Sequence, residues 1–210
     1  MSEPVTLRPP FSDPRQQHAA DLMGMYVFFG SEVMLFGGLF AVLGLLRLQH
    51  PGEYVAASRA LHVWIGAGNT AILLTSSLTM ALAVAAARQD ARRAAWRCLL
   101  ATAVLGAAFV ALKAAEWTLE YREGLLPVPG GDGALTAPVQ RLFMHLYLIA
   151  TGLHAIHLSI GTALALGLGF RIRRGLPLPG RAVTVEATGL YWHMVDLVWV
   201  FLYPVLYLAR

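Results

Sequence analysis

The sequence predicts an all-α integral membrane protein with five transmembrane helices, its N-terminus in the cytoplasm and its C-terminus outside. Hydrophobic residues make up 57% of the 210 residues and charged residues only 13%, a composition outside the range of soluble globular domains. The apolar residues gather in five long runs, and the basic residues are shared unequally between the two sides that these runs define. Together these observations favour a multi-pass protein of the cell inner membrane.

Each apolar run is long enough to cross a bilayer as a helix, which takes about 20 residues, whereas strands of membrane barrels take about 10. The predicted spans cover residues 23–46, 61–87, 94–119, 139–170 and 190–209. Residues 1–21 are polar and contain no apolar run, so we expect a cytoplasmic tail rather than a cleavable signal peptide. Residues 22–210 then form one membrane domain.

The basic residues indicate which helix ends face the cytoplasm. Ten of them fall on the side of the N-terminus and five on the opposite side, and cytoplasmic loops are enriched in Arg and Lys. The ten are Arg8, Arg15, Arg88, Arg92, Arg93, Arg97, Arg171, Arg173, Arg174 and Arg181, and the five are Arg47, Arg59, Arg122, Arg141 and Arg210. We therefore interpret the net charge of +4 as basic residues that orient the chain in the membrane, and we expect no nucleic-acid partner.

Glu32 lies near the middle of the first span, about 14 Å from its start at a rise of 1.5 Å per residue. An ionisable group at that depth costs several kcal/mol unless it is neutral, paired or hydrated, which makes Glu32 a candidate functional residue. The first span contains no basic residue that could pair with it, so the apolar setting favours the protonated carboxyl. The alternative is a protonated acid that only hydrogen-bonds within the bundle.

The third span carries Lys113, Glu116 and Glu120 on one helical face, because residues three, four and seven apart are neighbours on a helix. These residues lie toward the outer end of the span, where a lysine can extend to the interface. We therefore expect a charge-compensated helix end that water partly reaches. A proton or ion relay is the alternative interpretation.

The fourth span places His154 and His157 three residues apart on one face, near the centre of the membrane. Neutral imidazole is a common metal ligand, but a structural zinc site needs four ligands, and no cysteine or carboxylate of this span completes one. Cys98 is the only cysteine of the chain. We expect these histidines to form hydrogen bonds between helices.

The last span is the most aromatic, and Asp196 shares a helical face with Trp192 and Trp199. An intramembrane aspartate seeks a partner inside the protein, so we expect a hydrogen bond to Asp196 from His193 or from an indole. Tyr207, near the end of the span, fits a belt of aromatic residues at the outer interface.

Five segments of the chain resemble, in order, motifs of subunit III of the haem–copper oxidases, the cytochrome c oxidase subunit III family. They are FFGSEVMLFGGLF at 28–40, NTAILLTSS at 69–77, K-x-x-E-W at 113–117, ATGLHAIHLSIGT at 150–162 and GLYWHMVDLVWVFLYPVLYL at 189–208. The likeness covers about residues 22–209. Members of the family have seven spans or five, and this chain is similar to the five-helix form.

The resemblance implies a non-catalytic accessory subunit of an oxidase of the cytochrome c or quinol type. In the family, subunits I and II carry the haem and copper, while subunit III stabilises subunit I, sustains its proton uptake and holds structural phospholipids. Oxygen reduction in such respiratory complexes is coupled to proton pumping. The resemblance implies no metal ligand here, a functional carboxylate at Glu32, and structural, lipid or subunit contacts at His154, His157, His193, Asp196, Trp192, Trp199, Lys113 and Glu116.

Other interpretations stay open on the sequence. Met194 stands where the family usually has an aromatic residue, and the alanine-rich second and third spans are atypical of the main branch. The alternative within the family is therefore the homologous protein associated with nitric oxide reductase. A small transporter would use Glu32 and Asp196, and a haem or di-metal oxidoreductase would use the histidines of the last two spans. None of these patterns encodes the electron donor, the haem types or the lipid species.

Overall fold

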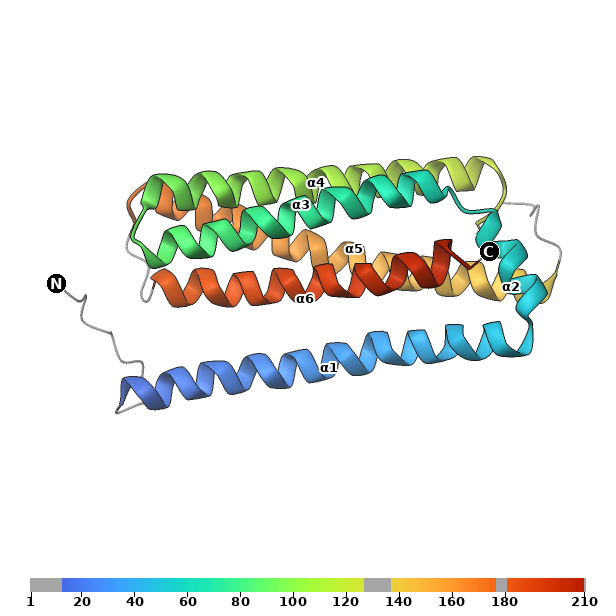
Figure 1. Ribbon diagram of the computed structural model, residues 1–210, viewed down its shortest axis with the longest axis horizontal. Helices are drawn as coiled ribbons and strands as arrows, with labels where there is room; N and C mark the ends of the chain where they lie inside the picture. Colours follow the sequence, from blue (N-terminus) through green and yellow to red (C-terminus); the bar gives the residue numbers. More distant parts are fainter. Residues whose placement is uncertain (1–12, 127–136, 177–180, 210) are drawn as a thin grey trace.

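The computed structural model describes residues 13–126, 137–176 and 181–209, and every regular element in these ranges is a helix (Figure 1). The helices are α1 (Pro14–Gln49), α2 (Pro51–Arg59), α3 (Val63–Arg88), α4 (Arg92–Arg122), α5 (Pro138–Arg173) and α6 (Arg181–Tyr207). Five stretches are long and apolar enough to cross a membrane: Met23–Gln49, Val63–Arg88, Arg92–Arg122, Pro138–Arg173 and Val183–Tyr207. Within the described ranges, the predicted all-helical fold with five membrane-spanning helices is confirmed.

The helix boundaries differ from the predicted spans at three places. α1 begins at Pro14, so residues 14–21 of the expected tail are helical, while residues 1–12 lie outside the described residues. α6 begins at Arg181 rather than near residue 190, because its first turns are polar enough to interrupt an apolar run without interrupting the helix. The apolar runs do not predict α2, because its nine residues are too few and too polar to form an apolar run.

Three helices end in the same hydrogen-bonded turn. The residue after each C-cap has a positive φ, of 52° at Asp90, 69° at Gly124 and 66° at Gly175. The following N–H bonds back to the carbonyl three residues before the C-cap, which satisfies a carbonyl that the helix itself leaves free. Glycine suits two of these positions because it has no Cβ to clash at positive φ.

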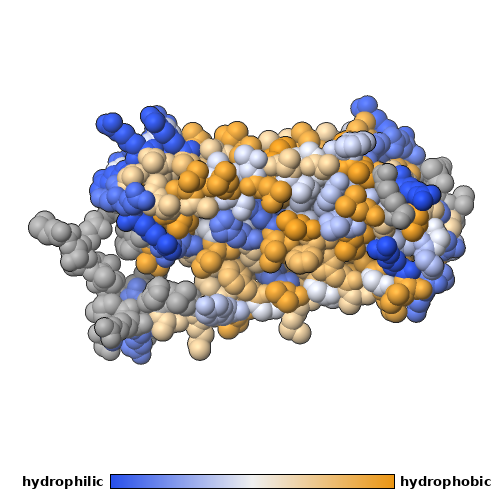
Figure 2. Space-filling view, in the orientation of Figure 1, coloured by the Kyte–Doolittle hydropathy of each residue, from blue (hydrophilic) through white to orange (hydrophobic). Residues whose placement is uncertain are grey.

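The four helices α3, α4, α5 and α6 pack side by side as a bundle, and α1 runs along one side of it beside α5 and α6 (Figure 1). α2 lies across the end of the bundle where α6 finishes. α1 begins at the opposite end from the end of α6, as an odd number of spans requires. Figure 2 shows hydrophilic side chains gathered at both ends of the long axis and a mostly hydrophobic surface between them.

Trp192 of α6 occupies the centre of the bundle and is fully buried. Its indole packs against Gly106 of α4 and Gly161 of α5, and its Nε1 donates a hydrogen bond to Ser76 Oγ of α3 at 3.1 Å. A Cβ at Gly106 would lie 2.7 Å from Cη2 of Trp192 and 2.5 Å from Oγ1 of Thr162. The glycines therefore let α4 and α5 enclose the indole.

We expect Gly106→Ala to lower the thermal stability of the purified chain by about 1–3 kcal/mol, because the new methyl forces Trp192 or Thr162 out of place. The matched control is Gly152→Ala on α5, whose methyl would meet no atom within 4 Å. That control replaces a helical glycine by a better helix former and gains up to about 1 kcal/mol. Thermal denaturation in detergent compares the two variants, and equal midpoints would contradict the close packing at Gly106.

The short helix α2 caps the end of α6 with two side-chain hydrogen bonds. The last four carbonyls of a helix have no partner within the helix. The Tyr54 hydroxyl donates to the carbonyl of Val205 at 2.8 Å, and the Ser58 hydroxyl donates to the carbonyl of Leu206 at 2.6 Å. Both donors are fully buried. α2 therefore fixes the end of the last span to the connection between the first two spans.

We expect Tyr54→Phe to lower the free energy of unfolding by about 1–3 kcal/mol, because it leaves the buried Val205 carbonyl without a donor. Burial raises the pKa of the Tyr54 hydroxyl from 10.0 to about 12, against the opposing effect of Arg47. The folded state thus holds this proton more firmly, so its contribution is complete below about pH 10 and is lost as the pH approaches 12.

Denaturation in detergent at neutral and alkaline pH measures both effects. Tyr121→Phe is the matched control, because Tyr121 is 49% exposed. A Tyr54→Phe variant as stable as this control, with the alkaline loss of the wild type, would contradict the cap.

Candidate functional site

Glu32 of α1 faces His157 of α5 across the boundary between α1 and the bundle. Nε2 of His157 lies 3.1 Å from Oε2 of Glu32, and both side chains are largely buried. The direction of the ring N–H leaves this contact an electrostatic one rather than a well-aligned hydrogen bond. The His157 ring also packs edge-on against Phe36 at 5.7 Å between ring centroids, which fixes its place beside α1.

The hydrogen bond of His157 fixes which ring nitrogen carries a hydrogen. Nδ1 of His157 lies 2.8 Å from the carbonyl oxygen of Leu153, which only accepts, so Nδ1 carries a hydrogen. Nε2 carries a second hydrogen only when the ring is positively charged. The lone pair of a neutral Nε2 repels a carboxylate, so the 3.1 Å contact is favourable in two forms: a charged ring beside a carboxylate, or a neutral ring beside a protonated carboxyl. Both of these forms have no net charge.

This partner changes the interpretation of Glu32. The sequence shows no base in the first span, and the structure supplies one from the fourth span instead. Tyr191 of α6 adds to the same region, since its hydroxyl donates to the carbonyl of His157 at 2.9 Å and its ring stacks on Phe28 at 5.8 Å. Glu32 is therefore held where α1, α5 and α6 meet.

His154 contacts helices α4 and α6 inside the bundle, whereas His157, three residues later, contacts α1. Its ring lies between Phe109, at 5.4 Å, and Trp199, at 5.1 Å, measured between ring centroids. Neither ring nitrogen has a hydrogen-bond partner, and the residue is 1% exposed. His157 thus contacts another helix, as expected, through an electrostatic contact with Glu32. The predicted hydrogen bond of His154 is wrong, because this ring packs among aromatic side chains instead.

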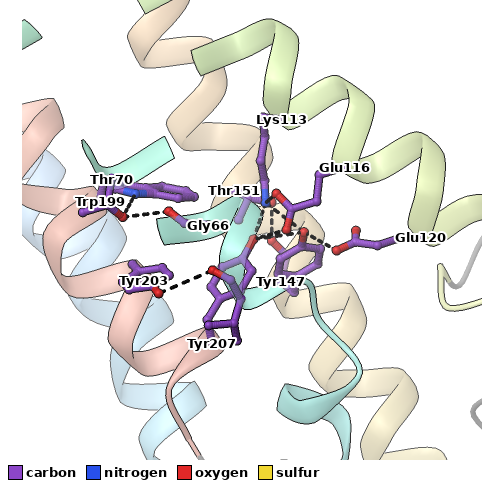
Figure 3. Close-up of polar contacts among 11 residues, drawn as sticks. Gly66, Thr70, Lys113, Glu116, Glu120, Tyr147, Thr151, Trp199, Tyr203 and Tyr207 are labelled. Carbon is purple, nitrogen blue, oxygen red and sulfur yellow. Dashed lines mark hydrogen bonds and ion pairs between the residues drawn. The ribbon is translucent and has the colours of Figure 1, made fainter. Parts of the chain in front are cut away.

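Hydroxyl groups of α3 form hydrogen bonds with side chains of α6. Trp199 Nε1 donates to Thr70 Oγ1 at 3.0 Å, and Ser77 Oγ lies 2.8 Å from Nδ1 of His193 (Figure 3 shows the Trp199 contact). Neither His193 nor an indole donates to the buried carboxyl of Asp196, and the hydroxyl that lies near this carboxyl is that of Ser77 on α3. The prediction that His193 or an indole bonds to Asp196 is therefore wrong, because hydroxyls of α3 are closer to these donors.

Lys113, Glu116 and Glu120 form a cluster inside the bundle rather than a hydrated helix end. Their exposed fractions are 1%, 0% and 0%, so the prediction of a partly wetted, snorkelling lysine is wrong. The physical reason is the pair of tyrosines that encloses them, Tyr147 of α5 and Tyr207 of α6 (Figure 3). Tyr207, which the sequence suggests for an interfacial belt, is itself fully buried.

Hydrogen bonds connect all five members of this cluster. Lys113 Nζ donates to Glu116 Oε2 at 3.0 Å, to the Tyr147 hydroxyl at 2.8 Å and to the Tyr207 hydroxyl. Tyr147 donates to Glu120 Oε1 at 2.7 Å, and Tyr207 donates to Glu116 Oε1 at 2.8 Å. The cluster ties α4, α5 and α6 together near the end of the bundle that α2 covers.

The sequence analysis misses both tyrosines as members of this site. A signal does exist for Tyr147, which lies seven residues before His154 and so shares the buried face of α5. The position of Tyr207 depends on how α6 packs against α4, which no spacing reveals. Among the described residues, no group of three or more His, Cys, Asp or Glu side chains could hold a metal ion.

The fold and these contacts define a multi-pass helical membrane protein whose ionisable side chains are largely paired between helices. The profile of the family "Cytochrome c oxidase subunit III" matches residues 17–209, and the chain belongs to this family. The family expected from the motifs is thereby confirmed. The protein is an accessory subunit of a haem–copper oxidase in the plasma membrane.

Two relatives illustrate the range of the family around this chain. This chain is 32% identical to cytochrome c oxidase subunit 3 of Thermostichus vulcanus over 193 residues, and the match covers 89% of this chain and 86% of the relative. It is 31% identical to a probable quinol oxidase subunit 3 of Staphylococcus aureus over 189 residues, covering 89% of this chain and 87% of the relative.

Proposed function

We propose that this chain stabilises subunit I of its oxidase and sustains proton uptake by that subunit over many turnovers. It contains no redox centre of its own, and its partners are subunits I and II and membrane phospholipids. The Glu32–His157 pair is the observation that carries the proposal. A neutral pair that shares one proton inside the membrane can hold that proton without creating a buried net charge.

The position of the pair fits a role at the edge of the subunit. α1 joins the bundle through a stripe of buried residues, Glu32, Phe36, Leu43 and Leu46, while other apolar side chains such as Val33, Met34 and Leu48 are exposed. A proton on the Glu32–His157 pair therefore lies at the joint between α1 and the other helices. Any partner that packs on α1 lies within a helix width of this proton.

A phospholipid beside α1 is the second part of the proposal. A hollow of about 530 Å³ lies along the first turns of α1 and is lined by Ala19, Met23, Tyr26 and Val27. Figure 2 shows an opening between α1 and the bundle at this end of the molecule. The lining side chains are mostly apolar, as contact with an acyl chain requires.

Two electron donors are compatible with the proposal, cytochrome c and a quinol. The two relatives bear the names of a cytochrome c oxidase subunit and a probable quinol oxidase subunit, and this chain matches them to nearly the same extent. We infer an N-terminus in the cytoplasm from the distribution of basic residues. The subunit I that co-purifies with the chain identifies the donor.

We expect Glu32→Gln to assemble normally but to shorten the active life of the oxidase severalfold, since glutamine keeps the size of glutamate and cannot share a proton with His157. The measurement is oxygen consumption by the purified complex, followed until it inactivates, with subunit I content determined in parallel. Glu53→Gln, at an exposed site outside the spans, is the control. If Glu32→Gln matches this control in initial rate and in durability, Glu32 serves packing alone.

We expect the isolated chain to bind no haem, copper or iron. Its histidines point to different partners: His154 to aromatic rings, His157 to Glu32 and His193 to Ser77. Metal analysis and an absorption spectrum of the chain after removal of subunit I measure this. A stoichiometric metal or a persistent Soret band would overturn the assignment of the redox centres to partner subunits.

A further inference from the structure

The cluster around Lys113 contains more carboxyl groups than cations. Lys113, Glu116 and Glu120 are all enclosed by protein, with exposed fractions of 0–1%. If all three were ionised, the cluster would keep one uncompensated negative charge inside the membrane. A buried charge without a partner is strongly unfavourable, so the cluster is expected to retain one proton.

The hydrogen bonds of Lys113 fix the charge of the lysine. Its Nζ donates to three different oxygens, on Glu116, Tyr147 and Tyr207. An ammonium group has three hydrogens to donate, whereas a neutral amine has two. The three bonds therefore require the charged form of Lys113.

The hydrogen bonds of the two carboxyl groups show where the extra proton fits. Both oxygens of Glu116 accept, one from Lys113 and one from Tyr207, which is the pattern of an ionised carboxylate. Oε1 of Glu120 accepts from Tyr147, but Oε2 of Glu120 is buried without any partner. Oε2 of Glu120 is thus the oxygen in the cluster that is free to carry a hydrogen.

We propose that this cluster is a proton-binding site, with Glu120 as the carboxyl that binds and releases the proton. In the bound state Lys113 is positive, Glu116 is negative and Glu120 is neutral. On release, the O–H bond of Glu120 breaks, the electron pair stays on Oε2, and the proton passes to water or to a buffer base. The cluster then carries one net negative charge. This site is separate from the Glu32–His157 pair and does not rest on the proposed function.

The proton reaches the cluster from the membrane surface where α4 ends. Glu123 lies three residues beyond Glu120, its side chain is 48% exposed, and its Oε2 lies 3.3 Å from Nε2 of His62. The remaining titratable and charged groups around Glu120 come from three helices: Lys113 and Glu116 of α4, Tyr147 of α5 and Tyr207 of α6. Glu123 interacts electrostatically with Glu120 and is the half-exposed carboxyl nearest to the cluster along α4.

Infrared spectroscopy of the full chain in nanodiscs tests the proposal, because a protonated carboxyl absorbs apart from carboxylates. We expect a protonated-carboxyl component in the wild type that is absent in Glu120→Gln and that disappears as the pH is raised, beside any component from Glu32 or Asp196. Glu116→Gln should lose the same signal, since the single remaining carboxyl then pairs with Lys113 as a carboxylate. Glu32→Gln is the control that should keep it.

The outcomes separate the proposal from a purely structural cluster. If Glu120 is ionised and only holds the helices together, neither Glu120→Gln nor Glu116→Gln changes the protonated-carboxyl signal, and the proposal fails. Thermal denaturation gives a second readout that needs no band assignment. The wild type should lose stability as the pH is raised, because the folded state loses a proton that it binds more firmly than the unfolded chain. Glu120→Gln should lose less stability than the wild type below about pH 10, where Tyr54 still keeps its proton, and equal pH profiles over this range would overturn the proposal.

Discussion

A bilayer offers no water to an ionisable side chain, so charged groups inside this protein are compensated by groups on other helices. Glu32 of α1 meets His157 of α5, and Lys113 of α4 meets tyrosines of α5 and α6. These contacts bring together helices that the apolar residues alone would hold in many registers, since lipid tails are as apolar as leucine. The polar pairs therefore specify which faces of the helices meet.

The two ionisable sites differ in their surroundings and hence in what they can do. The Glu32–His157 pair lies where α1 joins the bundle, beside an apolar hollow and within reach of a partner subunit. The Lys113 cluster lies inside the bundle and is closed on the outside by α2, which is itself held by Tyr54 and Ser58. In the Lys113 cluster hydrogen-bond directions, rather than proximity alone, indicate which group carries the extra proton.

Aromatic residues and glycines set the spacing of the bundle between these sites. Trp192 and Trp199 both donate to hydroxyls of α3, and Gly106 gives the first of these rings its space. The same hydroxyl residues of α3 include Ser77, which lies near both His193 and Asp196 of α6. A helix rich in serine and threonine thus serves as the acceptor surface for the most aromatic helix of the protein.

The sequence by itself determined the helical membrane class, the five spans and the family, because apolar run length and ordered motifs are local properties of the chain. It also singled out Glu32 and His157 as ionisable residues within the membrane, and it grouped Lys113 with Glu116 and Glu120 on one helical face. The tertiary structure alone decided their partners, because a helical spacing shows which residues share a face but not what that face contacts. It separated His154 from His157, enclosed Lys113 with Tyr147 and Tyr207, and placed α2 over the end of α6. Each of these outcomes depends on how helices far apart in the chain pack against one another, and no local pattern carries that information.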